Sequence, residues 1–229
     1  MSIYDPWMTM AGQLETSSDP APRSVHSFAA LGDSFTAGTG CRPGVRWADR
    51  LAGTLRARQH GRLAYGNYAE EGATSADLLE RQLNAALQLE PELATVICGA
   101  NDVLESVRPD VDACAERIAE IFDHLRDSVP GALVITATAP ERWRFLGLGP
   151  RTRRRVQDGL RELNRSIRQL AAQRGIPWLE VVGHPGLDDP VNFTDDGLHP
   201  SPIGHARTAE AFERLLASHL DVDETRGRS

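Results

Sequence analysis

Lysine is absent from this sequence, so all 25 basic residues are arginine, against 32 acidic residues. The formal net charge of −7 argues against a nucleic-acid-binding protein, because that class needs a basic surface to displace the counterions of the phosphates. We attribute the exclusive use of arginine to codon usage in a GC-rich genome rather than to a binding task. The sequence therefore predicts no nucleic-acid partner.

Cysteine is scarce as well. The three cysteines, Cys41, Cys98 and Cys114, show neither a CxxC motif nor a Cys/His spacing typical of metal ligands, and an odd number cannot all pair within one chain. We therefore expect reduced thiols, and we expect the chemistry of this protein to need no metal and no cofactor.

Long apolar runs are also missing. The chain holds no run of about 18 consecutive apolar residues, and its first residues lack the basic and apolar regions of a secretory signal peptide. The sequence thus predicts no membrane partner and a cytoplasmic location.

The chain contains enough apolar residues for one domain. Its 229 residues, 41% of them hydrophobic, suit a single well-filled globular core. Residues 15–24 are rich in serine, proline and charge, so we interpret residues 1–24 as a flexible leader and the polar residues 221–229 as a tail. Residues 25–220 are expected to form the domain.

Within that domain, short apolar runs alternate with segments of helical periodicity. The predicted strands cover residues 27–31, 63–68, 93–98, 132–138 and 177–182. The predicted helices cover residues 46–59, 75–89, 111–129, 153–173 and 202–220. Strict alternation predicts parallel pairing through right-handed crossovers, hence a three-layer α/β/α sandwich around a five-stranded parallel sheet. The active crevice of such a sheet lies beyond the carboxyl ends of its strands.

Positive charge is concentrated in one segment. Residues 141–174 carry ten arginines against three acidic residues, a net charge of +7 that leaves −14 for the rest of the chain. We favour a solvated helix surface as the interpretation, and the alternative is a docking patch for an acidic substrate or an acidic carrier protein.

The first predicted strand runs into the sequence GDSFTAG, which contains Ser34. A hydroxyl at the carboxyl edge of a sheet, in a turn whose glycines let the backbone bend sharply, is well placed to attack a substrate. A serine after a strand is also common in ordinary turns. The neighbouring Asp33 could act as an acid, but we favour a role in stabilising the turn.

Two further segments end at the same edge of the sheet. Gly72 stands just before a predicted helix, where free backbone N–H groups can stabilise an oxyanion, although a plain loop glycine is an equal alternative. Asn101, in the sequence GAND, offers a neutral NH₂ donor of the kind that an oxyanion hole requires. A helix cap or an Asx turn fits Asn101 equally well.

The fourth segment, DGLH, contains Asp196 and His199. Because Pro200 disfavours helical dihedral angles at His199, we expect a turn that could bring Asp196 to His199 Nδ1. Nε2 would then remain to accept the proton of Ser34, as in any Ser/His/acid triad. A surface aspartate and histidine in a loop is the alternative.

Together, GDSFTAG, residues 67–72, GAND and DGLH resemble the SGNH or GDSL hydrolase family in order and spacing. The resemblance spans roughly residues 28–199 and is greatest to small single-domain esterases common in actinobacteria. It implies a flavodoxin-like SGNH hydrolase fold.

The resemblance also implies a role for each of five residues. Ser34 would be the nucleophile, His199 its base and Asp196 the partner that orients the base. The backbone N–H groups of Ser34 and Gly72 and the side chain of Asn101 would be the oxyanion donors. The spacing typical of the family selects Asp196 over the neighbouring Asp195, and His205, in a helical pattern, is expected to be structural.

Three function classes follow from these residues. The first is hydrolysis of a small carboxylic ester or thioester through an acyl-enzyme on Ser34. The second is acyl transfer by the same triad in a biosynthetic pathway, with an acyl carrier protein as a candidate partner. The third is a noncatalytic binding module, which the completeness of all four segments argues against.

Substrate choice is expected to depend on residues 140–149, which follow the fourth predicted strand. This segment could form a flap over the acyl group, with Trp143, Phe145 and Leu146 facing the substrate. The same side chains could equally pack against the last helices.

Overall fold

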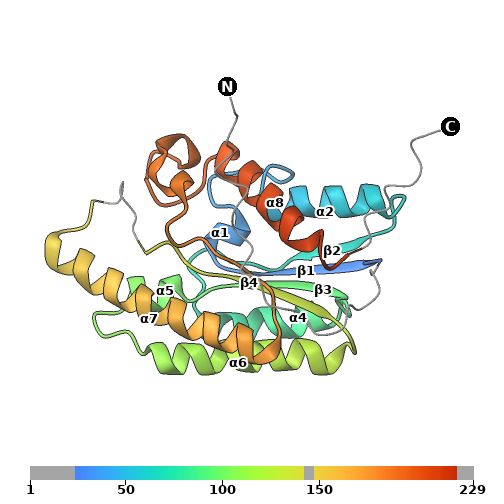
Figure 1. Cartoon of the computed structure of the whole chain (residues 1–229), viewed down its shortest axis with the longest axis horizontal. Coiled ribbons are helices and arrows are strands. Elements are labelled where there is room, and N and C mark those ends of the chain that lie inside the picture. The colour runs from blue at the N-terminus through green and yellow to red at the C-terminus, as the bar shows by residue number, and fades with distance from the viewer. Residues whose placement is uncertain (1–23, 142–146, 221–229) are drawn as a thin grey trace.

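The computed structural model describes residues 24–141 and 147–220, and Figure 1 shows them as a parallel sheet between two layers of helices. The strands are β1 (Ser27–Gly32), β2 (Ala64–Asn67), β3 (Leu93–Ile97), β4 (Leu133–Ala137) and β5 (Trp178–Leu179). Every neighbouring pair is parallel, in the order β2-β1-β3-β4-β5. The predicted α/β fold with a five-stranded parallel sheet is therefore confirmed.

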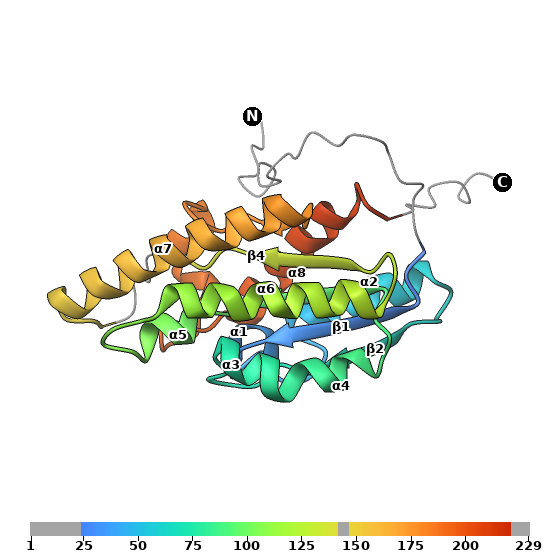
Figure 2. The same cartoon turned by 90° about the horizontal axis from the view of Figure 1, so that it is seen from below.

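Helices cover both faces of this sheet. They are α1 (Ser34–Ala37), α2 (Trp47–Arg58), α3 (Ser75–Asp77), α4 (Leu83–Leu87), α5 (Ala100–Leu104), α6 (Val111–Ser128), α7 (Pro150–Arg174) and α8 (Pro202–Leu216). A π-helical turn η2 (Leu78–Gln82) joins α3 to α4, and two 3₁₀ turns, η3 (Pro185–Asp188) and η4 (Pro190–Asn192), precede α8. Helices α2 and α8 cover one face, and α4, α6 and α7 cover the other (Figures 1 and 2).

Strand β1, which lies between β2 and β3, is buried on both faces. Phe28 and Ala30 pack into the apolar cluster beneath α2 and α8, whereas Ala29 and Leu31 pack into the cluster beneath α4, α6 and α7. This alternation follows from the two-residue period of a strand, and it explains why the segment reads as a continuous apolar run.

The order of the strands reverses beside β1. From β1 the chain runs to β2 on one side and later to β3 on the other, so the carboxyl ends of β1 and β3 flank a topological switch point. In open α/β sheets the ligand binds at such a point. Ser34 follows β1 directly, and Asn101 follows β3 after three intervening residues.

The predicted helix over residues 202–220 ends at Leu216 in α8, and the predicted helix over residues 153–173 begins at Pro150 in α7. Two other predicted elements differ because of contacts between distant parts of the chain. Strand β5 ends at Leu179 rather than at residue 182, because the N–H of Val181 turns to the side-chain oxygen of Thr138, at 2.8 Å, instead of continuing the ladder. The predicted helix over residues 75–89 is interrupted by η2. Within that turn the buried Gln82 side chain donates to the carbonyl of Gly32 and accepts from its N–H, at 2.9 and 3.0 Å, which anchors the end of β1.

Part of the basic segment is neutralised within the fold. Arg161, Arg168 and Arg174 pair with acidic groups at 2.7–2.8 Å. The remaining arginines of α7 include four exposed ones, namely Arg151, Arg153, Arg154 and Arg165. These four arginines therefore give α7 a solvent-exposed basic surface.

Candidate active site

The turn after β1 holds Ser34 at the first position of α1. The Asp33 carboxylate caps this short helix by accepting the N–H of Phe35 at 3.0 Å, which is the turn-stabilising contact expected from the sequence. At its other end Gly38 adopts φ of +74° and donates to the Ser34 carbonyl. Gly32 has no room for a side chain, because a Cβ there would lie 2.7 Å from the Ile97 carbonyl oxygen.

Asp196 and His199 form the contact that the DGLH segment predicts. Asp196 Oδ2 lies 2.6 Å from His199 Nδ1, and Asp196 Oδ1 accepts the backbone N–H groups of Leu198 and His199 at 2.8 and 2.9 Å. The loop is closed by a bond from the Thr194 N–H to the His199 carbonyl. The aspartate therefore fixes both the backbone and the ring of His199, and leaves Nε2 for another partner.

The charge of Asp196 is stabilised by these contacts. Partial burial raises the pKa of the Asp196 carboxyl, but hydrogen bonds from the His199 side chain, the backbone N–H groups of His199 and Leu198, and the Thr194 hydroxyl hold the pKa well below its usual range. Asp196 is therefore an anion at neutral pH, as a group that orients a histidine must be.

Asn101 lies in the first turn of α5. Its side-chain NH₂ donates to the carbonyl of Ala73 at 3.0 Å, a contact between segments 28 residues apart rather than a local cap or Asx turn. An amide NH₂ has two donors, so the second is available for another acceptor. Asn101 thus links the loop after β2 to the loop after β3.

Gly72 is placed differently from the other two predicted oxyanion donors, Ser34 and Asn101. It is exposed and adopts φ of +73°, a conformation that favours glycine, and no hydrogen-bond partner of its N–H is found among the described residues. It is not among the residues that line the cavity at the carboxyl edge of the sheet, whereas Ser34, Asn101 and His199 are.

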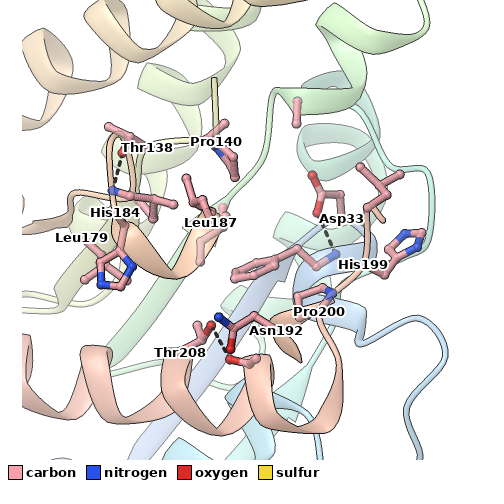
Figure 3. Close-up of a pocket in the computed structure, with 18 of the residues that line it drawn as sticks. Asp33, Thr138, Pro140, Leu179, His184, Leu187, Asn192, His199, Pro200 and Thr208 are labelled. Atoms are coloured by element: carbon pink, nitrogen blue, oxygen red, sulfur yellow. Dashed lines mark hydrogen bonds between the residues drawn. The ribbon is translucent and has the colours of Figure 1, made fainter. Parts of the chain in front are cut away.

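A cavity of about 150 Å³ opens at the carboxyl ends of β1, β3, β4 and β5. Figure 3 shows Asp33 and His199 on one side of it, Leu187 and Thr138 on the other, and Thr208 on α8 below. Ser34 also lines this cavity, but the described part of the chain holds no hydrogen bond between its Oγ and His199 Nε2. Such bonds often form only in the complex with substrate.

A network behind the site was not foreseen from the sequence. The Asp102 carboxylate accepts the Ser75 N–H and hydroxyl at 2.9 and 2.6 Å, and Arg117 of α6 donates to both residues. The network therefore holds the start of α3 against α5, and with it the segments that carry Gly72 and Asn101.

The buried thiol of Cys98 also lines the cavity. Burial raises its pKa well above the usual range, so it remains a thiol at neutral pH and does not compete as a nucleophile. All three cysteines are free, as expected.

A model of the GDSL-like lipase/acylhydrolase family matches residues 30–207. The chain belongs to this family. An arylesterase of Vibrio mimicus is 25% identical over 202 residues, which cover 87% of this chain and 92% of the relative.

Solved structures of similar fold include an acetylxylan esterase of Geobacillus stearothermophilus, with a TM-score of 0.68 and 20% identity over 84% of this chain and 94% of that one. TesA has a TM-score of 0.64 and 22% identity over 85% of this chain and 99% of that one. The predicted resemblance to SGNH or GDSL hydrolases is confirmed, and the protein is an SGNH-type carboxylic ester hydrolase.

Metal-binding clusters and membrane-spanning helices were sought in residues 24–141 and 147–220 of this GDSL hydrolase. Over these ranges, no cluster of three or more histidine, cysteine or acidic side chains is arranged to hold a metal ion. None of the helices found there is long and apolar enough to span a membrane.

In this GDSL hydrolase, burial raises the pKa of Asp33 to about 6, although the Phe35 N–H and the nearby His199 act in the opposite direction. The folded state therefore binds more protons than the unfolded state between about pH 4 and 6, and the free energy of unfolding falls as pH rises through that window. Replacing Asp33→Asn keeps an acceptor for Phe35 and removes the cost of a buried charge.

We expect Asp33→Asn to raise the free energy of unfolding by roughly 3 kcal/mol at pH 7.5 and by little at pH 4. Urea denaturation at both pH values measures the difference. The exposed Asp127→Asn on α6 is the control and should keep the pH dependence of the wild type. An unchanged pH dependence in Asp33→Asn would contradict the expected role of the buried carboxyl.

The family resemblance implies that Asn101 is an oxyanion donor, and the loss of one such donor lowers kcat by roughly 10²–10³-fold in other hydrolases, so we expect Asn101→Ala to have an effect of that size. Steady-state kinetics with a chromogenic ester measures it, and circular dichroism shows whether the variant is folded. The exposed Asn84→Ala on α4 is the matched control. A folded Asn101→Ala variant with unchanged kcat would remove Asn101 from the site.

Proposed function

We propose that Ser34, His199 and Asp196 are the catalytic triad of this esterase, which acts through an acyl-enzyme on Ser34. The observation that carries the proposal is the 2.6 Å contact between His199 Nδ1 and Asp196 Oδ2, with the His199 ring and Ser34 lining the same cavity. A carboxylate on Nδ1 favours the tautomer in which Nε2 is the base.

In the first step, Ser34 Oγ bonds to the carbonyl carbon of the ester and His199 Nε2 takes the hydroxyl proton. The tetrahedral intermediate then collapses, its bond to the leaving oxygen breaks, and His199 returns the proton to the alcohol. In the second step water attacks the acyl-enzyme with the same base, which releases the acid and restores Ser34.

The negative oxygen of the intermediate would be stabilised by three donors. These are the free N–H of Asn101 Nδ2 and the backbone N–H groups of Ser34 and Gly72. Ser34 is the first residue of α1, so its own N–H is not consumed by a bond within that helix. Gly72 contributes only if its exposed turn moves toward the cavity when substrate binds.

Ester and thioester carbonyls suit this mechanism equally, and the relatives include an arylesterase and an acetylxylan esterase. Acyl transfer to an alcohol or amine by the same triad is the second candidate. The exposed arginines of α7 would favour an acidic acyl carrier protein as its donor. The leader, domain and tail boundaries and the cytoplasmic location stay predictions.

Covalent labelling tests the proposal. A fluorophosphonate probe should form one adduct with the folded wild type, and peptide mass spectrometry should place that adduct on Ser34. Product analysis with and without added alcohols or amines should yield free acid in both cases if the enzyme hydrolyses esters. A folded wild type that takes no label would overturn the triad.

A further inference from the structure

The active-site cavity extends from an accessible mouth to a buried end. Ser34, Asn101 and His199 are partly exposed, whereas the far wall includes Leu179 and Phe212, which are 6% and 0% exposed. Both far-wall residues belong to the apolar cluster between the sheet and α8. A ligand attached at Ser34 can therefore reach into the layer beneath α8.

Three polar side chains of the cavity lining, Thr138, Asn192 and Thr208, are already hydrogen-bonded to the protein. Thr138 donates to Glu180 and accepts from Val181, Asn192 donates to the Gly186 carbonyl, and Thr208 donates to the Gly204 carbonyl. A polar ligand group placed there would lose its water without gaining equivalent bonds. The far wall therefore favours an apolar group.

The position of His199 determines which part of an ester enters the buried end of the cavity. His199 must protonate the leaving oxygen, so the alcohol lies beside His199 and its partly exposed loop. The acyl substituent on the same carbon then points away from His199, toward the opposite wall where Figure 3 shows Leu187 and Leu179. The acyl group, not the alcohol, is the part that the cavity encloses.

The size of the cavity limits that acyl group. The cavity measures about 150 Å³, and an apolar cavity of about that volume in another protein holds one benzene molecule. We infer that the cavity is an acyl pocket for an unbranched acyl chain of about four to six carbons or a single phenyl ring, and that Ala211 of α8, a buried residue of its lining, sets its depth. This inference rests on the proposed function.

The test compares p-nitrophenyl esters of acetate, butyrate, hexanoate and decanoate, which share one leaving group. In the wild type, kcat/KM should rise roughly fourfold for each added methylene up to hexanoate and fall for decanoate. Ala211→Leu should fill the far end, lower kcat/KM for hexanoate by at least about tenfold, and change the value for acetate by less than about threefold.

Two further variants distinguish a change in the pocket from a general folding defect in Ala211→Leu. Leu187→Ala removes part of the opposite wall and should raise kcat/KM for decanoate relative to hexanoate. Ala217→Leu, at the exposed end of α8, is the matched control and should keep the wild-type order of substrates. Acetate esters of alcohols of increasing length should show no selective loss in Ala211→Leu.

The outcomes separate this inference from the proposed function. If the folded wild type cleaves none of the esters and takes no fluorophosphonate label, both are overturned. If it takes the label but cleaves none of the esters, the acyl pocket alone is overturned. If it cleaves them with acetate preferred, or if Ala211→Leu and Leu187→Ala leave the order unchanged, the acyl pocket alone is overturned. A dependence of Ala211→Leu on alcohol length instead of acyl length would also overturn the assignment.

Discussion

Ser34→Ala is expected to lower kcat/KM by roughly 10⁵–10⁶-fold, since removal of the nucleophile of a serine triad has an effect of that size on turnover. The variant should fold normally, because the Ser34 hydroxyl makes no hydrogen bond within the described part of the chain and its backbone role in α1 is unchanged. Ester hydrolysis and thermal unfolding, measured on the same preparation, test both expectations.

The fluorophosphonate probe adds a second readout for this variant. Ser34→Ala should take no label, whereas the control Ser166→Ala, a partly buried serine of α7, should be labelled and active like the wild type. Activity or labelling that survives in Ser34→Ala would assign the nucleophile to another residue.

Asp196→Asn is expected to lower kcat by roughly 10⁴-fold, equivalent to about 5 kcal/mol of transition-state stabilisation. The amide is nearly isosteric, and its oxygen can still accept the N–H groups of Leu198 and His199. An amide NH₂ facing His199 Nδ1, however, favours the tautomer with the proton on Nε2, which cannot serve as the base.

The neighbouring aspartate supplies the control for this prediction. Asp195 is also exposed and stands one residue earlier, but Asp196 is the residue that bonds the ring. Asp195→Asn should therefore keep kcat within about twofold of the wild type, a change on the order of 0.5 kcal/mol or less. A large loss in Asp195→Asn, with Asp196→Asn active, would reverse the assignment.

Most of the fold could be predicted because its signals are local. The alternation of apolar runs with helical periodicity predicts the sheet, and the predicted helices over residues 46–59 and 111–129 agree with α2 and α6 within one residue at each end. The predictions for β5 and the helix after residue 75 were less accurate. There, long-range bonds from Thr138 and Gln82 replace regular backbone pairing, and no local pattern encodes them.

The candidate site, like the fold, has some features that follow from local sequence and others that depend on long-range contacts. The Asp196 to His199 contact spans three residues in a turn, so the sequence could predict it. Gly72 was expected among the same group of residues, yet it lies outside the cavity lining, because the path of a loop depends on what it packs against. The roles of Trp143, Phe145 and Leu146 concern residues outside the described ranges.

By itself, then, the sequence determined the class of the sheet, the carboxyl edge at which Ser34 stands, and the turn that pairs Asp196 with His199. Only the tertiary structure decided the raised pKa of Asp33, since desolvation depends on what surrounds a group. The Asp102 network and the apolar cavity likewise form only in the folded chain. The walls of that cavity come from strand ends and from α8, which meet only when the chain is folded.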